Sequence, residues 1–271
     1  MTFIRFWFLV LSFVFFFPSA LFALDKPFDH SAWDQFLKEF VNEQGEVNYE
    51  AAQKTPTLLN HYIEQLAAVD YEDLVRKWPR EEKLALWLNA YHVGVTRAIL
   101  DHYPVQSIQN IAGVWDLPLV RIGNQTFSLN HIRARQLLGV YRDEKIHLAL
   151  ACGAKSCPRL RREAFTGPRV EGQLFLATRD FVNDPIYTQI TPGQKKIHVS
   201  RIFKWYAKDF TLDFGSVEIG RKLAPEEIAV LSFIAHYLED SQKVQYLEDG
   251  RYKIQYLLFD WKLNDWHSAS A

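Results

Sequence analysis

The sequence of 271 residues is 48% hydrophobic and 23% charged, and its 31 Lys and Arg residues nearly balance 32 Asp and Glu residues, for a formal net charge of -1. This apolar content excludes an intrinsically disordered chain, and the charge balance excludes a strongly basic nucleic-acid-binding protein. Twelve Gly and 11 Pro also exclude a collagen-like or linker-like architecture.

The N-terminal segment has the pattern of a secretory signal peptide. Arg5 is the one charged residue before Asp25, residues 6–17 are almost wholly apolar, and Pro18 interrupts the run ahead of the small residue Ala23. This order predicts cleavage after Ala23, although the uncharged residues 6–24 could instead act as an uncleaved anchor. We therefore expect a leader at residues 1–23, no membrane span after cleavage, and a soluble periplasmic or secreted protein at residues 24–271.

The first part of the mature chain has helical patterns. Apolar residues spaced three and four apart predict a helix that begins at Ser31. Pro56 stands where a first helical position is expected and opens a second helix. Residues 81–101 are apolar on most sides, which predicts a helix buried by several neighbours.

The pattern becomes mixed beyond Pro104. Gly123-Asn124 between apolar runs predicts a short hairpin, Ser128 is placed to cap a helix, and the short apolar run 146–152 resembles a buried strand closed by Gly153. The later expected elements are helices over residues 170–181, 200–209 and 225–238, a strand over residues 195–199, and a hairpin of residues 244–247 with 252–259. This irregular alternation predicts an α+β fold, a single mixed domain with a buried central helix and short, mostly antiparallel strands.

Both cysteines of the chain lie in one short run, with four residues between them. In an oxidising compartment Cys152 and Cys157 are expected to form a disulfide, because a turn at Gly153 could bring their Cα atoms within bridging range. Alternatively, Cys152 is a free nucleophile whose pKa is lowered by Lys155. No metal and no cofactor are expected, since the sequence has no ligand spacing for zinc and no phosphate-binding loop.

A nucleophilic Cys152 needs a general base, and His147 is the tempting choice. The two are five positions apart, however, so in a regular strand their side chains would point to opposite faces. The buried helix offers an alternative, because Asn89, His92 and Thr96 form a polar stripe on it. That stripe either lines a cleft or forms a structural hydrogen-bond network with neighbouring backbone.

The resulting hydrolase hypothesis gives each group a role. Cys152 attacks a carbonyl, His147 or His92 acts as base, and Asp209 or Asn89 orients the imidazole. The backbone N–H groups of Gly153-Ala154 are expected to form an oxyanion hole. The predicted ligand-contacting residues are Tyr91, His92, Ser156, Lys204 and Trp205.

Five segments together resemble the domain-of-unknown-function family DUF547, and they run in family order over nearly all the mature chain. They are residues 45–49, 83–91, 146–158, 202–206 with 209–210, and 260–264. The family usually has Asn where His92 stands, which favours Asn89 and Tyr91 as the special residues of the helix. Some members carry Ser at the position of Cys157 while keeping Cys152, so the resemblance gives Cys152 added weight. It implies one domain and supplies no activity.

Two functions are therefore expected from the sequence. The first is an extracytoplasmic thiol-dependent hydrolase or acyl transferase. The second is a non-catalytic binding or interaction module held by a Cys152–Cys157 disulfide, with a small molecule, a peptide or a glycan as its ligand. Nucleic acid is not an expected partner.

Overall fold

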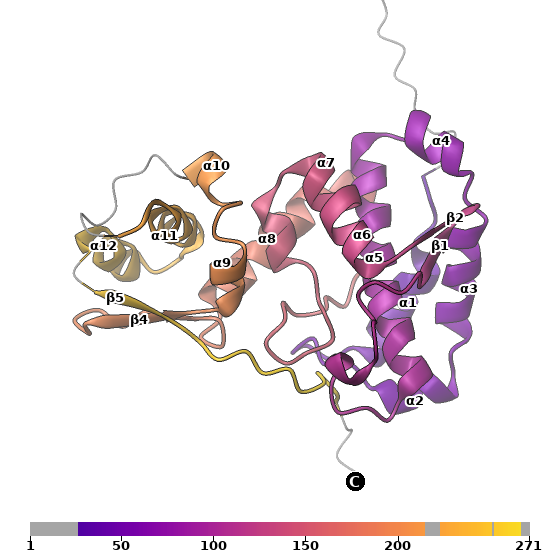
Figure 1. The fold of residues 1–271 in the computed structure, drawn as a ribbon, viewed down its shortest axis with the longest axis horizontal. Coiled ribbons are helices and arrows are strands. Elements are labelled where there is room, and N and C mark those ends of the chain that lie inside the picture. The colour runs from indigo at the N-terminus through magenta and orange to yellow at the C-terminus, as the bar shows by residue number, and fades with distance from the viewer. Residues whose placement is uncertain (1–26, 215–222, 251, 267–271) are drawn as a thin grey trace, which may run out of the picture.

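The chain folds into helices with two small sheets (Figure 1). The structure is a computed structural model that describes residues 27–214, 223–250 and 252–266. The predicted leader and its cleavage site lie outside the described residues. Among those residues, no helix combines the length and the apolar character that a membrane span requires.

The N-terminal half is helical except for one hairpin. Its elements are α1 (Ser31–Phe40), α2 (Tyr49–Lys54), α3 (Thr57–Ala67), α4 (Tyr71–Arg76), α5 (Arg80–His102), η1 (Ile108–Asn110), β1 (Val120–Ile122), β2 (Gln125–Phe127), α6 (Leu129–His131), the π-helical η2 (Ile132–Leu138), α7 (Gly139–Tyr141) and η3 (Glu144–Leu148). Helix α1 begins at the predicted Ser31, α3 follows the predicted Pro56, and Ser128 caps α6 by accepting a hydrogen bond from the His131 N–H. These three predictions are confirmed.

The C-terminal half carries the second sheet. Its elements are η4 (Gly167–Arg169), α8 (Val170–Asn183), β3 (Thr188–Gln189), β4 (Lys196–Val199), α9 (Arg201–Trp205), α10 (Thr211–Phe214), α11 (Pro225–Tyr237), α12 (Ser241–Asp249) and β5 (Lys253–Tyr256). Strand β4 pairs antiparallel with β3 and parallel with β5, whereas β1 and β2 form the predicted antiparallel hairpin. The predicted α+β class with short, mostly antiparallel strands is confirmed.

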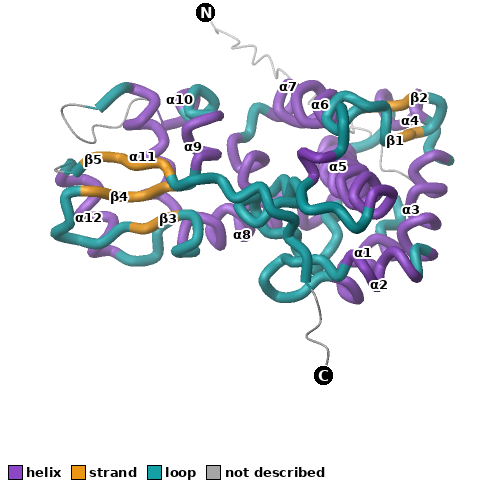
Figure 2. The backbone as a smooth tube through the Cα atoms, turned by 60° about the horizontal axis from the view of Figure 1, so that its bottom comes forward, coloured by secondary structure: helices purple, strands orange, loops and turns teal. Residues whose placement is uncertain are grey.

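The buried apolar side chains form two hydrophobic clusters. The first cluster contains α5 and the elements before α8, and the second contains α9, α11 and the three-stranded sheet. Helix α8 joins them, because Val170 and Leu174 belong to the first cluster while Phe181 and Val182 belong to the second. Figure 1 shows α8 between the two groups of elements, and Figure 2 shows the two sheets at opposite ends of the molecule.

Helix α5 is the buried central helix that the sequence predicts. It is buried over most of its length from Leu84 to Leu100 and contacts helices and the hairpin on several sides. At Gly94 an added Cβ would lie 2.5 Å from a Val120 methyl carbon, so only glycine allows the hairpin to approach this closely.

A C-terminal strap, residues 257–266, connects the two clusters. It continues from β5, at the second cluster, towards the helices of the N-terminal half (Figure 1). Leu263 belongs to the first cluster. Asn264 fixes its end: the Tyr49 hydroxyl donates to Asn264 Oδ1 (2.8 Å), and Asn264 Nδ2 donates to the Gly45 carbonyl (3.2 Å). The strap is therefore anchored in the N-terminal part of the fold.

The strand predicted over residues 146–152 is wrong. The chain forms the 3-10 helix η3 (Glu144–Leu148) and then an irregular loop, and Asp143 stabilises the turn by accepting a hydrogen bond from the Lys145 N–H. Ile146, His147 and Leu148 are all buried. A short apolar run indicates only that its residues are buried on all sides. A turn packed between two hydrophobic clusters is buried in this way, as a central strand is.

The hairpin predicted around Asp249-Gly250 is also wrong. Residues 244–247 belong to α12, whose start is capped by the Asp240 side chain and whose end is terminated by Gly250 in the left-handed conformation (φ 63°). β5 then pairs parallel with β4. The Gly that resembled a hairpin turn is a helix C-cap, which uses the same conformation. Helix α9 is likewise shorter than the helix predicted over residues 200–209.

We expect Asn264→Ala to lower the free energy of unfolding by about 2–4 kcal/mol, because it leaves the buried Tyr49 hydroxyl and Gly45 carbonyl without their partner. Lys262→Ala, an exposed position on the same strap, should change it by less than about 0.5 kcal/mol. Urea unfolding of both variants measures the difference. Equal stability of the two would show that the strap is not anchored through Asn264.

Candidate functional site

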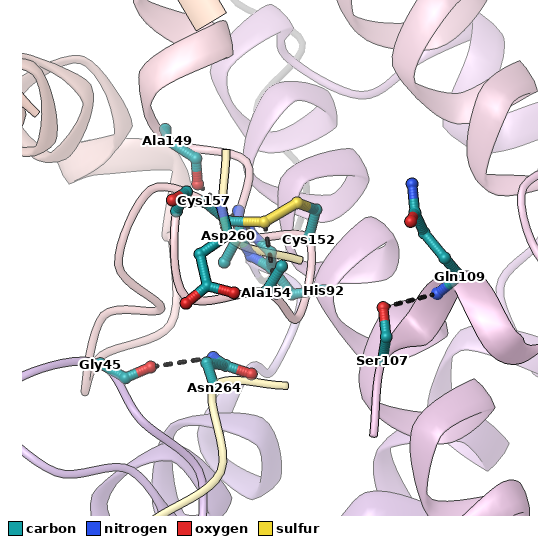
Figure 3. Close-up of a disulfide and its surroundings, with 12 residues drawn as sticks. Gly45, His92, Ser107, Gln109, Ala149, Cys152, Ala154, Cys157, Asp260 and Asn264 are labelled. Carbon is teal, nitrogen blue, oxygen red and sulfur yellow. Dashed lines mark hydrogen bonds between the residues drawn. A yellow bond between two sulfur atoms is a disulfide. The ribbon is translucent and has the colours of Figure 1, made fainter. Parts of the chain in front are cut away.

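The two cysteines are joined by a disulfide that closes a tight loop (Figure 3). The Cα atoms of Cys152 and Cys157 are 5.6 Å apart. Gly153 makes the turn possible, because its φ of +79° is strained for other residues and an added Cβ would lie 2.6 Å from Ile99 of α5. The disulfide predicted from the sequence is thus present, and both sulfurs are bonded in this form of the chain.

The loop is held from two directions. From α5, His92 Nε2 lies 3.1 Å from both the Ala149 carbonyl and the Ala151 N–H. From the strap, the Lys262 carbonyl accepts a hydrogen bond from the Lys155 N–H (2.9 Å), and the Asp260 N–H donates to Ser156 Oγ of the loop (2.9 Å). Figure 3 shows the disulfide close to His92 and Asp260. Helix α5 and the strap together fix the position of Cys152.

A His–Asp pair forms the second part of the site. His147 Nε2 lies 2.7 Å from Asp209 Oδ2, although 62 residues separate them in sequence. The imidazole is 1% exposed and stacks on the Tyr206 ring, with the centroids 4.0 Å apart. Asp209 is one of the two residues, with Asn89, that were predicted from the sequence to orient an imidazole. Its carboxylate is 51% exposed, so it remains in contact with solvent.

The electrostatics of the pair favour a neutral imidazole beside an ionised carboxylate. Burial lowers the pKa of His147 more than the hydrogen bond with Asp209 raises it. The same hydrogen bond lowers the pKa of Asp209. At neutral pH His147 is therefore able to accept a proton, and the remaining ring nitrogen, Nδ1, has no hydrogen-bond partner among the described residues.

Cys152 and His147 both border one cavity of about 220 Å³, and Asp209 reaches it through its hydrogen bond with His147. The strand geometry expected from the sequence would have separated His147 from Cys152, whereas the turn places both at this cavity. The residues around them are Tyr91, Trp115, Asn130, Arg133, Leu150, Pro158, Ile202, Trp205, Tyr206, Phe259 and Trp261. Leu150 belongs to the first hydrophobic cluster, Ile202 to the second, and Phe259 and Trp261 to the strap, so the cavity lies where all three meet.

A larger cavity of about 390 Å³ lies elsewhere, and its charges are already compensated. Arg159 pairs with Asp184, Arg161 with Asp180, and Arg162 with Glu43. This arrangement is typical of a structural ion network. The smaller cavity, which combines a histidine, an aspartate partner and a sulfur atom, is the better candidate site.

The polar stripe of α5 has a structural role. Asn89 donates to the Phe165 carbonyl (2.8 Å) and accepts the Phe165 N–H (3.0 Å), so it does not orient His147. His92 is occupied by the backbone of the cysteine loop. Asn89 and His92 therefore belong to a structural hydrogen-bond network with neighbouring backbone. Tyr91, on the same helix, borders the cavity.

The remaining predicted residues differ in their positions. Trp205 borders the cavity and is 46% exposed. The Lys204 ammonium lies over the Tyr256 ring, 5.4 Å from its centroid. Ser156 holds the strap through Asp260. The Ala154 N–H, expected in an oxyanion hole, donates to Cys157 Sγ (3.3 Å) in the disulfide form.

Four residues that border the cavity were not predicted from the sequence: Arg133, Trp115 and the two strap aromatics Phe259 and Trp261. Trp115 lies in a stretch without helix or strand, and Arg133 lies on η2 among other polar residues. Nothing in their local sequence separates them from ordinary surface or packing residues. They reach one cavity only through the tertiary fold: the strap supplies Phe259 and Trp261, whereas η2 and the segment before β1 supply Arg133 and Trp115.

Comparison with known families gives a match for part of the chain. Residues 75–182 match the family described as "Protein of unknown function, DUF547", so a DUF547 family domain lies at these residues. The matched segment contains α5, His147 and the cysteine loop. No curated protein and no solved structure matched the chain. Within the described part of the chain, no three His, Cys, Asp or Glu side chains are grouped to hold a metal ion.

We expect protonation of His92 to weaken the fold as the pH falls. Burial lowers the pKa of His92 from 6.5 to about 4, so between these values the unfolded chain binds the extra proton and the folded chain does not. The stabilising contribution is complete above about pH 6.5 and decreases by about 2–3 kcal/mol by about pH 4.5. Because burial also lowers the pKa of His30 to about 4, the His92 contribution is measured as the difference between the unaltered chain and a His92 variant in urea unfolding between pH 7 and pH 4.5.

His92→Asn should lower stability at pH 7 and also make it less dependent on pH over this range, since Asn does not titrate. His61→Asn, at an exposed position, should keep the dependence of the unaltered chain. An identical pH dependence in both variants would contradict the neutral, buried state of His92.

Proposed function

We propose that this protein is an extracytoplasmic thiol-dependent hydrolase or acyl transferase, whose nucleophile Cys152 is held in reserve by the disulfide with Cys157. The observation that carries the proposal is that Cys152 and His147 line one cavity, while Asp209 holds His147 by a hydrogen bond. A nucleophile, a base and a residue that orients the base are the minimum set for covalent acyl transfer. The apolar leader supports the extracytoplasmic location.

The disulfide must open before catalysis. A dithiol reductant of the same compartment gives two electrons and two protons to the Cys152–Cys157 bond and is itself oxidised to a disulfide. Cys152 is the half-exposed partner and Cys157 is buried at 3% exposure. The freed Cys152 thiol therefore faces the cavity, while Cys157 remains in the protein interior.

Catalysis then follows from the positions of the side chains. His147 Nδ1 takes the proton of the Cys152 thiol, and Asp209 at Nε2 stabilises the imidazolium. The thiolate attacks a substrate carbonyl, the carbonyl bond to the leaving group breaks, and the leaving group takes the proton from His147. Water, or an acceptor amine or alcohol, then attacks the thioester, gives its proton to His147 and regenerates the Cys152 thiolate.

A non-catalytic binding module is the second candidate, and the intact disulfide favours it. The bonded Cys152 sulfur has no proton to transfer, and the Ala154 N–H is directed at Cys157 Sγ rather than at a substrate oxygen. In this alternative the cysteine loop serves only to shape the wall of a ligand cavity.

Two single-cysteine variants separate these functions. In Cys157→Ser the thiol of Cys152 is free at the cavity that His147 also lines, so we expect it to react with iodoacetamide at pH 7 at least about tenfold faster than the buried Cys157 thiol in Cys152→Ser. His147 accepts the proton of the thiol, and the resulting thiolate–imidazolium pair raises the fraction of Cys152 that is reactive. Mass spectrometry against time measures both rates without a reductant.

The role of Asp209 is tested in the Cys157→Ser background. Asp209→Asn should slow alkylation several-fold, by about 3–10 times, whereas Asp213→Asn, an exposed carboxylate nearby in sequence, should leave the rate unchanged. If Cys152 reacts no faster than Cys157, or if the two Asn variants behave alike, the thiol mechanism fails and the binding module is favoured.

A further inference from the structure

Arg133 is an arginine at the cavity that has no carboxylate partner among the described residues. Its Nη1 donates to the Tyr206 hydroxyl (3.0 Å) and its Nη2 to Asn130 Oδ1 (3.3 Å), both neutral groups. The guanidinium carbon lies 5.4 Å from the centre of the Tyr206 ring. The arginines of the larger cavity, in contrast, are each paired with a carboxylate.

The charge of Arg133 acts within the candidate site. It contributes to the lowering of the pKa of both His147 and Asp209, yet Asp209 is engaged with His147 and forms no ion pair with Arg133. A half-buried guanidinium with only neutral partners retains much of its attraction for an anion. Its planar donors fit the two oxygens of a carboxylate.

The rest of the cavity is apolar and small. Trp115, Trp205, Phe259 and Trp261 supply its aromatic surface. Its volume of about 220 Å³ is below the range of about 300–1,000 Å³ for drug-sized ligands, which suits a fragment of the size of one amino-acid residue.

Arg133 is the one fully charged group among the described side chains that line the cavity. The other polar groups are Asn130, His147, the Tyr91 and Tyr206 hydroxyls, and the indole N–H groups of Trp115, Trp205 and Trp261. An apolar body with one carboxylate uses the aromatic walls and the single unpaired cation together.

We infer that the cavity takes an apolar residue with a free carboxylate, the C-terminal residue of a peptide, with its carboxylate on Arg133 and its side chain against the tryptophans. This inference rests on the proposed function and names its substrate class. Cys152 would attack the carbonyl of the preceding residue, and water would replace the terminal amino acid, which leaves with the proton from His147.

Binding is tested on the full chain in its disulfide form, which needs no thiol. The probes are N-acetyl-L-phenylalanine, its uncharged amide, and 3-phenylpropanoate, an apolar acid without the peptide group. Calorimetry should show at least tenfold tighter binding of the N-acetyl acid than of the amide or of 3-phenylpropanoate. Indole N–H resonances of Trp205 and Trp261 should shift when the acid is added.

Arg133→Gln should remove the preference for the acid over the amide, and Arg133→Lys should keep part of it because the positive charge remains. Arg135→Gln, at an exposed position on the same η2 helix, should retain the full preference. Loss of the preference in Arg133→Gln with retention in both other variants supports the inference.

Other results overturn the inference in distinguishable ways. Equal binding of the acid and the amide would show that Arg133 does not bind the carboxylate. Tight binding of 3-phenylpropanoate would show that the cavity binds a simple apolar acid and not the end of a peptide. Failure of all three probes would reject the substrate class. These binding results do not depend on the alkylation rates of Cys152, which test the proposed function separately.

Discussion

The strap of residues 257–266 is the constraint on which the candidate site depends. It begins beside the second hydrophobic cluster, places Leu263 in the first, and donates or accepts backbone hydrogen bonds along the cysteine loop. Without it the loop from Gly153 to Ser156 would leave several backbone groups without partners, which is costly in a buried segment. The strap also supplies Phe259 and Trp261, so it both fixes the loop and forms one wall of the cavity.

The same region shows how a histidine can be buried at the cavity and remain hydrogen-bonded. Moving His147 out of water favours its neutral form, and Asp209 on the solvent side compensates by accepting or stabilising a ring proton. Tyr206 covers the ring face and in turn binds Arg133. A base, its orienting carboxylate and an unpaired cation are thus connected through one tyrosine.

Much of the fold could be predicted from the sequence wherever local chemistry decides. Periodicity identified α5, and Gly123-Asn124 identified the β1–β2 hairpin. Prediction failed where one signal has two meanings: the apolar run 146–152 is equally suited to a buried strand or a buried turn, and Gly250 is equally suited to a hairpin or a helix C-cap. For the site, Cys152, His147 and Asp209 could be named. Arg133 could not, because its significance lies in its neutral hydrogen-bond partners Tyr206 and Asn130, and no local sequence pattern indicates these contacts.

The central claim is that Cys152 and His147 act as one unit, and an NMR titration of the His147 ring tests it most directly. The comparison uses Cys157→Ser, which frees the Cys152 thiol, and Cys152→Ser, which removes it. A thiolate beside the ring stabilises the imidazolium, so the pKa of His147 should be higher in Cys157→Ser by at least about one unit. The same His147 titration in both variants would contradict the account.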